Sequence, residues 1–156
     1  GTTLTVREQI EHLPEAGSSG DALHDLSSPR RTARIQALIA AVPKNGGSRH
    51  SLPPEMQLKC HLKTTGFNDV YGRMHWDQVS PTITSGCTNP SKGRFLHPNE
   101  DRPITLREAA MLQGFHKSYK FDTSHGKEAI SLMIGNALPP PFIAAHSAAM
   151  AEALKR

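Results

Sequence analysis

Residues 102–115 read Arg102-Pro103-Ile104-Thr105-Leu106-Arg107-Glu108-Ala109-Ala110-Met111-Leu112-Gln113-Gly114-Phe115 and predict a helix with a clear start and end. Thr105 and Glu108 have the spacing of a capping box, in which each side chain satisfies a backbone N–H that the helix start leaves free. Gly114 is the residue type at which helices commonly end. The apolar positions fall on one side of this helix, at Leu106, Ala109, Ala110 and Leu112. We therefore expect one face of it to lie in a core.

A second informative stretch follows after about twenty residues and reads Ile134-Gly135-Asn136-Ala137-Leu138-Pro139-Pro140-Pro141. Gly135 permits close approach of another backbone, and Asn136 carries both hydrogen-bond donors and an acceptor. By itself this pattern also fits a simple turn before a helix. The proline run is expected to start a final helix, with one face formed by Ile143, His146, Met150, Ala153 and Leu154.

The composition limits the classes of protein to consider. A chain of 156 residues fits one domain or part of a larger one, and no apolar run approaches the ~20 residues of a membrane span. Cys60 and Cys87 are the only cysteines and lack the Cys-x-x-Cys spacing, so we expect no disulfide framework, no metal site and a cytoplasmic location. The nine histidines offer no pair at the spacing of a helical zinc motif.

The charges are unevenly distributed along the chain. Residues 27–94 carry ten basic and three acidic side chains, whereas residues 1–26 carry one basic and five acidic side chains. A basic middle segment is typical of a surface that faces a polyanion such as nucleic acid. The same pattern also fits a solvated face of an ordinary basic protein.

The remaining patterns indicate an α+β chain, mostly helical with a small irregular β-element. Ser28-Pro29 is expected to open a helix with an apolar stripe at Ile35, Leu38, Ile39 and Val42. Residues 70–76 and 81–86 are short β-prone pieces. Residues 1–27, rich in Gly, Ser and acids, are expected to form a loop-rich linker with a short helical turn.

Several motifs occur in a fixed order between residues 69 and 141: Asp69-Val70-Tyr71-Gly72-Arg73-Met74-His75-Trp76-Asp77, Ser80-Pro81-Thr82-Ile83-Thr84, Gly93-Arg94-Phe95-Leu96-His97-Pro98, and the two stretches above. In this order they resemble the C-terminal part of bacterial DNA (cytosine-5) methyltransferases of restriction-modification systems. His116 departs from the family pattern, which usually has Pro after Gln-Gly-Phe. The resemblance implies a C-terminal fragment that completes a Rossmann-like methyltransferase dependent on S-adenosylmethionine. Its parts would be a linker at 1–27, a target-recognition region at 28–103 and docking helices at 104–156.

The resemblance also assigns roles to individual residues. Asn136 and Ala137 would contact S-adenosylmethionine, and Arg107 with Glu108 would have a structural role, Arg107 bracing the recognition region against the catalytic domain. Without the family, Arg107 fits an ordinary surface position. Contacts with double-stranded DNA are expected from the basic middle segment, at Arg49, Lys63, Arg73, Thr82, Thr84, Lys92 and Arg94.

The motifs that carry the chemistry of this family do not occur in the sequence. It contains no Pro-Cys, no Glu-Asn-Val and no Phe-x-Gly-x-Gly, so no catalytic residue is assigned and the chain alone is expected to be inactive. The expected partner is the N-terminal catalytic portion of the same enzyme or a separate catalytic subunit, with an apolar docking face that could cause artefactual dimers. A stand-alone DNA-binding module and an RNA-directed relative stay open as alternatives.

Overall fold

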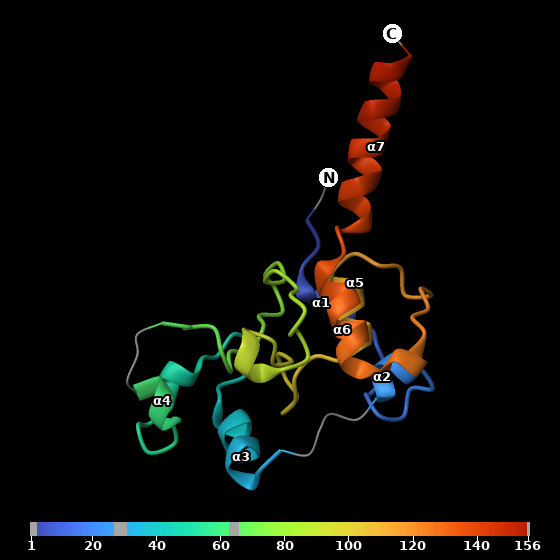
Figure 1. Ribbon diagram of the computed structural model, residues 1–156. Helices are drawn as coiled ribbons and strands as arrows, with labels where there is room; N and C mark the ends of the chain where they lie inside the picture. The colour runs from blue at the N-terminus through green and yellow to red at the C-terminus, as the bar shows by residue number, and fades with distance from the viewer. Residues whose placement is uncertain (1–2, 27–30, 63–65, 156) are drawn as a thin grey trace.

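The computed structural model describes residues 3–26, 31–62 and 66–155, which form helices joined by long irregular segments (Figure 1). The α-helices are α1 (Val6–Ile10), α2 (Ala22–Asp25), α3 (Ala33–Ala41), α4 (Lys59–Leu62), α5 (Leu106–Leu112), α6 (Gly126–Asn136) and α7 (Pro140–Leu154). Short 3-10 turns are η1 (Arg49–Ser51), η2 (Pro90–Lys92) and η3 (Thr123–His125). In the described part of the chain, pairing of β type is limited to isolated bridges of Leu96 with Arg73 and with Pro103. The expected helical chain is confirmed, and its β-element is smaller than expected.

Helix α5 lies at the centre of the larger core and packs against α1, α2 and α6. The capping box predicted from the sequence is present, with Thr105 accepting from the Glu108 N–H and Glu108 accepting from the Thr105 N–H. Gly114 follows the helix with a φ of +95°, a conformation that favours glycine. The buried side chains of this core include Val6, Ile10, Leu23, Met74, Trp76, Ile104, Leu106, Ala109, Ala110, Ile130 and Ile134. Burying each of the larger ones contributes about 1.5–3 kcal/mol.

The N-terminal segment is part of this core, which differs from the expected linker. Val6, Ile10 and Leu23 have at most 2% of their surface exposed. The buried His24 ring bonds the Thr105 hydroxyl at 2.8 Å and the Pro14 carbonyl at 2.9 Å. The small and acidic residues that suggested a linker instead fold a local turn, in which the Asp25 carboxylate accepts from backbone N–H groups of this segment.

A second, smaller core lies under α3 and contains Leu38, Ile39, Val42, Leu52, Val70, Tyr71 and Leu96. The predicted stripe of α3 is confirmed at its buried positions, with Ile35 packed at the edge. The helix start differs from the prediction, because Thr32 is the N-cap and its hydroxyl accepts from the Ile35 N–H. The predicted start at Ser28 lies outside the described residues.

His116 stands where the family pattern has proline, and it begins a turn in which the Tyr119 N–H donates to the His116 carbonyl at 2.9 Å. Its ring Nδ1 lies 2.7 Å from the Ser118 hydroxyl and 3.3 Å from the Ser118 N–H. The next residues are held by a cluster of three aromatic rings, with centroids about 5 Å apart, formed by Phe115, Tyr119 and Phe121.

Helix α7 projects away from the rest of the molecule (Figure 1), and none of its residues is buried. The large apolar side chains exposed on α6, on α7 and between them are Leu132, Met133, Leu138, Phe142, Ile143, Met150 and Leu154. We call this set the exposed apolar residues of α6 and α7. No helix in the described ranges has the length and hydropathy needed to cross a membrane.

Candidate nucleic-acid and cofactor-binding site

Arg73 lies in the interior of the protein, with no exposed surface. Its guanidinium donates to the carbonyl oxygens of Ile39 at 2.8 Å and Val42 at 2.9 Å, behind α3, and to that of His97 at 3.0 Å. It also donates to the Glu100 carbonyl and to the Asp101 carboxylate. In this arrangement its N–H groups bond to the protein itself. The expected DNA contact of Arg73 is therefore wrong, and its guanidinium instead joins the end of α3 to residues 97–101.

Two further arginines expected at DNA are also engaged with the protein itself. Arg94 donates to the Asp69 carboxylate at 3.1 Å and to carbonyl oxygens of Gly46 and Arg73, each at 3.0 Å. Arg49 is 1% exposed and donates to the Gly66 and Phe67 carbonyls. The physical reason is shared: irregular segments without β-ladders leave buried carbonyls, and a guanidinium has five donors to satisfy them.

The other candidates for DNA contact lie at the surface, except that Lys63 falls outside the described residues. Thr82 and Thr84 are exposed, whereas Ile83 between them is 3% exposed and packs in the larger core. This alternation directs both threonines outward, as in an extended segment. Lys92, at the end of η2, is exposed as well.

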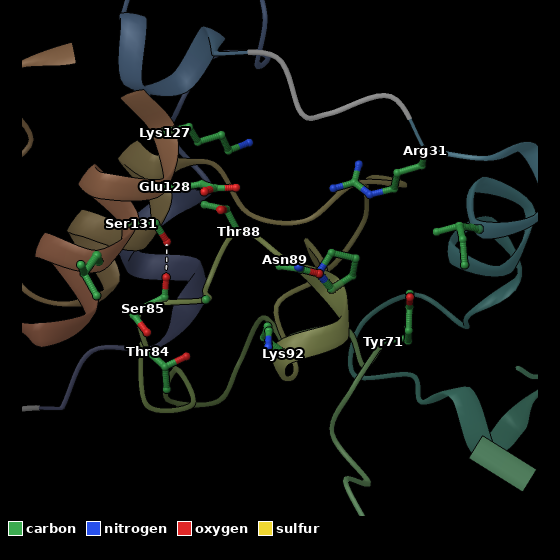
Figure 2. Close-up of a pocket in the computed structure, with 14 residues that line it drawn as sticks. Arg31, Tyr71, Thr84, Ser85, Thr88, Asn89, Lys92, Lys127, Glu128 and Ser131 are labelled. Carbon is green, nitrogen blue, oxygen red and sulfur yellow. Dashed lines mark hydrogen bonds between the residues drawn. The ribbon is translucent and has the colours of Figure 1, made fainter. Parts of the chain in front are cut away.

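Helix α6 joins this exposed segment to the candidate cofactor residues. The Ser131 hydroxyl donates to the Ser85 carbonyl oxygen at 2.8 Å, as Figure 2 shows. One turn further along, a Cβ on Gly135 would lie 2.1 Å from the Ser85 nitrogen, so only glycine allows this approach. The Gly135-Asn136 pair therefore forms the last residues of a helix packed on the Thr84–Ser85 backbone, and the alternative of a simple turn is wrong.

Asn136 and Ala137 differ in what they offer a ligand. Asn136 is exposed at the end of α6. Ala137 has its N–H bonded to the Ile134 carbonyl at 3.2 Å and its own carbonyl bonded by the Gln113 amide at 2.6 Å. Asn136 is thus the stronger candidate for polar contact with a cofactor, and Ala137 offers mainly its methyl group.

A cavity of about 700 Å³ opens between α6, η2 and the segment before α3 (Figure 2). Lys92 and Thr84 line it, together with basic residues that sequence analysis did not select, Arg31 and Lys127. Arg31 stands beside Arg30 in the basic middle segment, and this charge was the one available signal for it. The position of Lys127 near the same cavity depends on the packing of α6.

Arg107 and Glu108 both make internal contacts. Arg107 donates to the Asp21 carboxylate and to the Tyr119 carbonyl at 2.9 Å, which joins α5 to α2 and to the aromatic cluster. Glu108 is 1% exposed and accepts two hydrogen bonds of 2.8 Å from Arg102. Burial acts to raise the pKa of Glu108, but the Arg102 hydrogen bonds and charge outweigh it and hold that pKa below its ordinary value.

The two cysteines lie in different surroundings. Cys87 is buried, and desolvation raises the pKa of its thiol. Cys60 is exposed. Among the described residues, no three His, Cys, Asp or Glu side chains come together as a possible metal site.

Comparison with known proteins identifies the family to which this sequence is similar. Residues 5–152 match the family of C-5 cytosine-specific DNA methylases. The chain is 41% identical over 144 residues to the Type II methylase M.HgiDII of Herpetosiphon aurantiacus, covering 86% of this chain and 40% of that protein. It is 33% identical over 146 residues to the Type II methyltransferase M.AgeI of Thalassovita gelatinovora, covering 93% of this chain and 31% of that protein.

A plant protein shows the same similarity over a shorter range. DNA (cytosine-5)-methyltransferase 3 of Arabidopsis thaliana is 40% identical over 90 residues, which cover 57% of this chain and 6% of that protein. In all of these comparisons the chain spans less than half the length of its relative. Because the family match extends over nearly the whole sequence, the chain belongs to the C-5 cytosine-specific DNA methylases.

Proposed function

We propose that this chain is the C-terminal portion of a DNA (cytosine-5) methyltransferase that recognises target DNA and completes the S-adenosylmethionine pocket. Its relatives carry the name of this activity, and the family match includes all the motifs discussed above. In this proposal residues 28–103 form the recognition region and residues 104–156 dock on the catalytic domain. The N-terminal segment belongs with α5, because Val6, Ile10 and Leu23 pack in the same core.

The observation that carries this proposal is the contact between α6 and the Thr84–Ser85 backbone. The Ser131 hydrogen bond and the close backbone approach at Gly135 hold the Thr84–Ser85 backbone against α6. The exposed Thr82 and Thr84 are thereby placed next to the end of the helix that bears Asn136. A methyltransferase must bring bound DNA and methyl donor close together, and in this proposal the contact between α6 and the Thr84–Ser85 backbone would supply that relation.

S-adenosylmethionine supplies the methyl group when it is bound. Asn136 is the residue whose exposed amide can donate to and accept from polar groups of the cofactor. Ala137 would contribute van der Waals contact, since its backbone groups are already engaged.

The reactive thiolate would come from the catalytic portion, in the same enzyme or in a separate subunit. Cys87 is buried with a raised pKa, and the chain has no Pro-Cys dipeptide. The exposed apolar residues of α6 and α7 would face that portion, which is expected to have the Rossmann-like fold. Leu138 and Phe142 are more than half exposed, next to the candidate cofactor residues in the chain.

Two assays test the proposal on the chain itself. Fluorescence anisotropy should show binding to duplex DNA that weakens steeply with salt, and radiolabelled S-adenosylmethionine should give no label in the DNA. Label transferred by the chain alone would contradict the proposal that the reactive thiolate comes from the catalytic portion. An RNA duplex of the same sequence, bound more tightly than the DNA, would favour the RNA-directed alternative.

A chimera tests the cofactor role. This chain would replace the matching segment of M.HgiDII, and the chimera should methylate DNA. The Asn136→Ala change in it should raise KM for S-adenosylmethionine more than it lowers affinity for DNA. A chimera that binds DNA but transfers no methyl group would favour the alternative of a DNA-binding module only. An active chimera with unchanged KM for the cofactor after the Asn136→Ala change would contradict the cofactor role of Asn136.

A further inference from the structure

Three cationic side chains from three separate segments line the cavity between α3 and α6. Arg31 precedes α3, Lys92 ends η2, and Lys127 lies in the first turn of α6. Figure 2 shows the Arg31 guanidinium and the Lys127 ammonium directed toward one another across the opening. The segments are far apart in the sequence, so tertiary structure has gathered these charges at one place.

The charge of this cavity is predominantly positive. Glu128 is the one acidic residue among the described residues that line it, against the three cations. Burial and, next, the positive charge of Arg31 lower the pKa of Lys127. Two like charges held across one opening are stabilised by an anion placed between them.

Neutral donors line the same cavity. Thr84, Ser85 and Thr88 contribute hydroxyl groups to its wall. The Asn89 side-chain oxygen already accepts from the Ser91 N–H at 3.0 Å and the Ser91 hydroxyl at 2.8 Å, so the amide N–H groups are what it can offer to a ligand. Hydroxyl, amide and cationic groups together are the usual partners of phosphate oxygens.

The N-terminus of α6 adds to the positive charge of this cavity. Its N-cap residue, His125, makes no side-chain capping bond, and the start of an eleven-residue helix carries a partial positive charge. Lys127 lies within this first turn, so the helix and its side chain favour the same sign of ligand.

We propose that this cavity binds a phosphodiester group of the DNA backbone, held by Arg31, Lys92 and Lys127. The inference rests on the proposed function, because it assumes that the chain contacts duplex DNA. Thr84, one of the two exposed threonines, lines the cavity, so a DNA strand bound there would also pass the threonine segment. The site positions the duplex and does not read its sequence, since phosphates are the same at every step.

The test measures affinity of the 156-residue chain for two unrelated duplexes of equal length, over a range of salt concentration. Arg31→Gln and Lys127→Gln should each reduce the slope of log K against log salt by about 0.9. That change in slope corresponds to roughly 8-fold weaker binding of the variant near 0.1 M salt. The loss should be equal on both duplexes. Glu128→Gln should act in the opposite direction and tighten binding.

Matched controls separate a local site from net charge. Lys120→Gln removes one positive charge at an exposed lysine away from the cavity, and Glu15→Gln removes one exposed negative charge. Both should change affinity less than 2-fold. Thermal unfolding of each variant checks the fold, and Lys92→Gln, at an exposed position, supplies the decisive comparison if Arg31→Gln unfolds.

The outcomes distinguish this inference from the proposed function. If the wild-type chain binds duplex DNA with a steep salt slope but the cavity variants behave like Lys120→Gln, the phosphate site is overturned and the function stands. A loss on only one of the two duplexes would also overturn it, since that pattern belongs to base contact. If the wild-type chain binds no duplex at all, both proposals fail.

Discussion

The Ser131 hydroxyl donates a 2.8 Å hydrogen bond to the carbonyl oxygen of Ser85, 46 residues away in the chain. This bond holds α6 against the segment that exposes Thr82 and Thr84. The buried Cys87 also contacts Ser131, with its sulfur 3.4 Å from the same hydroxyl. The position of the exposed threonines is therefore set by the helix that also carries Asn136.

The close approach at Gly135 predicts that any side chain there is destabilising. In Gly135→Ala the new methyl would overlap the Thr84 and Ser85 backbone, which cannot move without displacing α6. We expect a loss of about 1–3 kcal/mol in the free energy of unfolding, measured by urea denaturation. Gly66→Ala is the control, because a Cβ there meets nothing within 4 Å. Equal stability of the two variants would show that the contact is looser than described.

The interior position of Arg73 predicts a large structural effect. Arg73→Lys keeps the charge but loses the fork that serves several carbonyls, and we expect a cost of about 3–5 kcal/mol. Lys44→Gln removes the exposed partner that shares Asp101 with Arg73, and it should cost at most about 1 kcal/mol. A DNA contact would give the reverse pattern for Arg73→Lys, with stability unchanged and affinity for DNA reduced.

The ion pair of Glu108 predicts a pH dependence of stability in the acid range. Its pKa in the folded protein lies below the ordinary value of 4.5, so its contribution is present above that pH. The contribution is lost as pH falls through the folded pKa. Between pH 5 and pH 3 the free energy of unfolding of Glu108→Gln should therefore fall less steeply than that of the wild type. Equal slopes for Glu108→Gln and the wild type would contradict this prediction.

The two thiols should differ in reactivity. Cys60 is exposed, whereas Cys87 is buried and burial raises the pKa of its thiol. A chromogenic disulfide reagent at neutral pH should titrate one thiol per native chain quickly and both after denaturation. Cys60→Ser should abolish the rapid phase. A rapid phase that persists in Cys60→Ser would show that Cys87 is accessible.

The exposed apolar residues of α6 and α7 predict self-association of the isolated chain at high concentration. Sedimentation velocity should show larger species as concentration rises, and Ile143→Glu should reduce them by placing a charge among these residues. Gln78→Glu adds the same charge at an exposed polar position and should leave association unchanged. A wild-type chain that stays monomeric at millimolar concentration would contradict this prediction.

The local elements were accessible from the sequence. The capping box of Thr105 and Glu108 involves partners three residues apart, so residue type and spacing are enough to predict it. The stripe Leu38, Ile39 and Val42 is buried as its spacing predicts. The start of α3 differs from the prediction, because Thr32 is the N-cap rather than Ser28.

The roles of the arginines needed the tertiary structure. By residue type, Arg73 and Lys92 are both basic positions in a basic segment, yet one is fully buried and the other exposed. Arg73 is buried because carbonyls of residues more than 20 positions away converge on it. Conversely, Arg31 and Lys127 belong to no common sequence motif, and only the folded chain brings both to the lining of one cavity.

The sequence by itself therefore determined the family, the capped helices and the order of the motifs, all of which depend on residue type and short spacing. Tertiary structure decided which basic side chains bond to backbone carbonyls inside the protein and which face solvent. It also made the N-terminal segment part of the core. The reason is physical: a charged side chain is buried only where distant backbone groups satisfy its hydrogen bonds, and those distances exist only after folding.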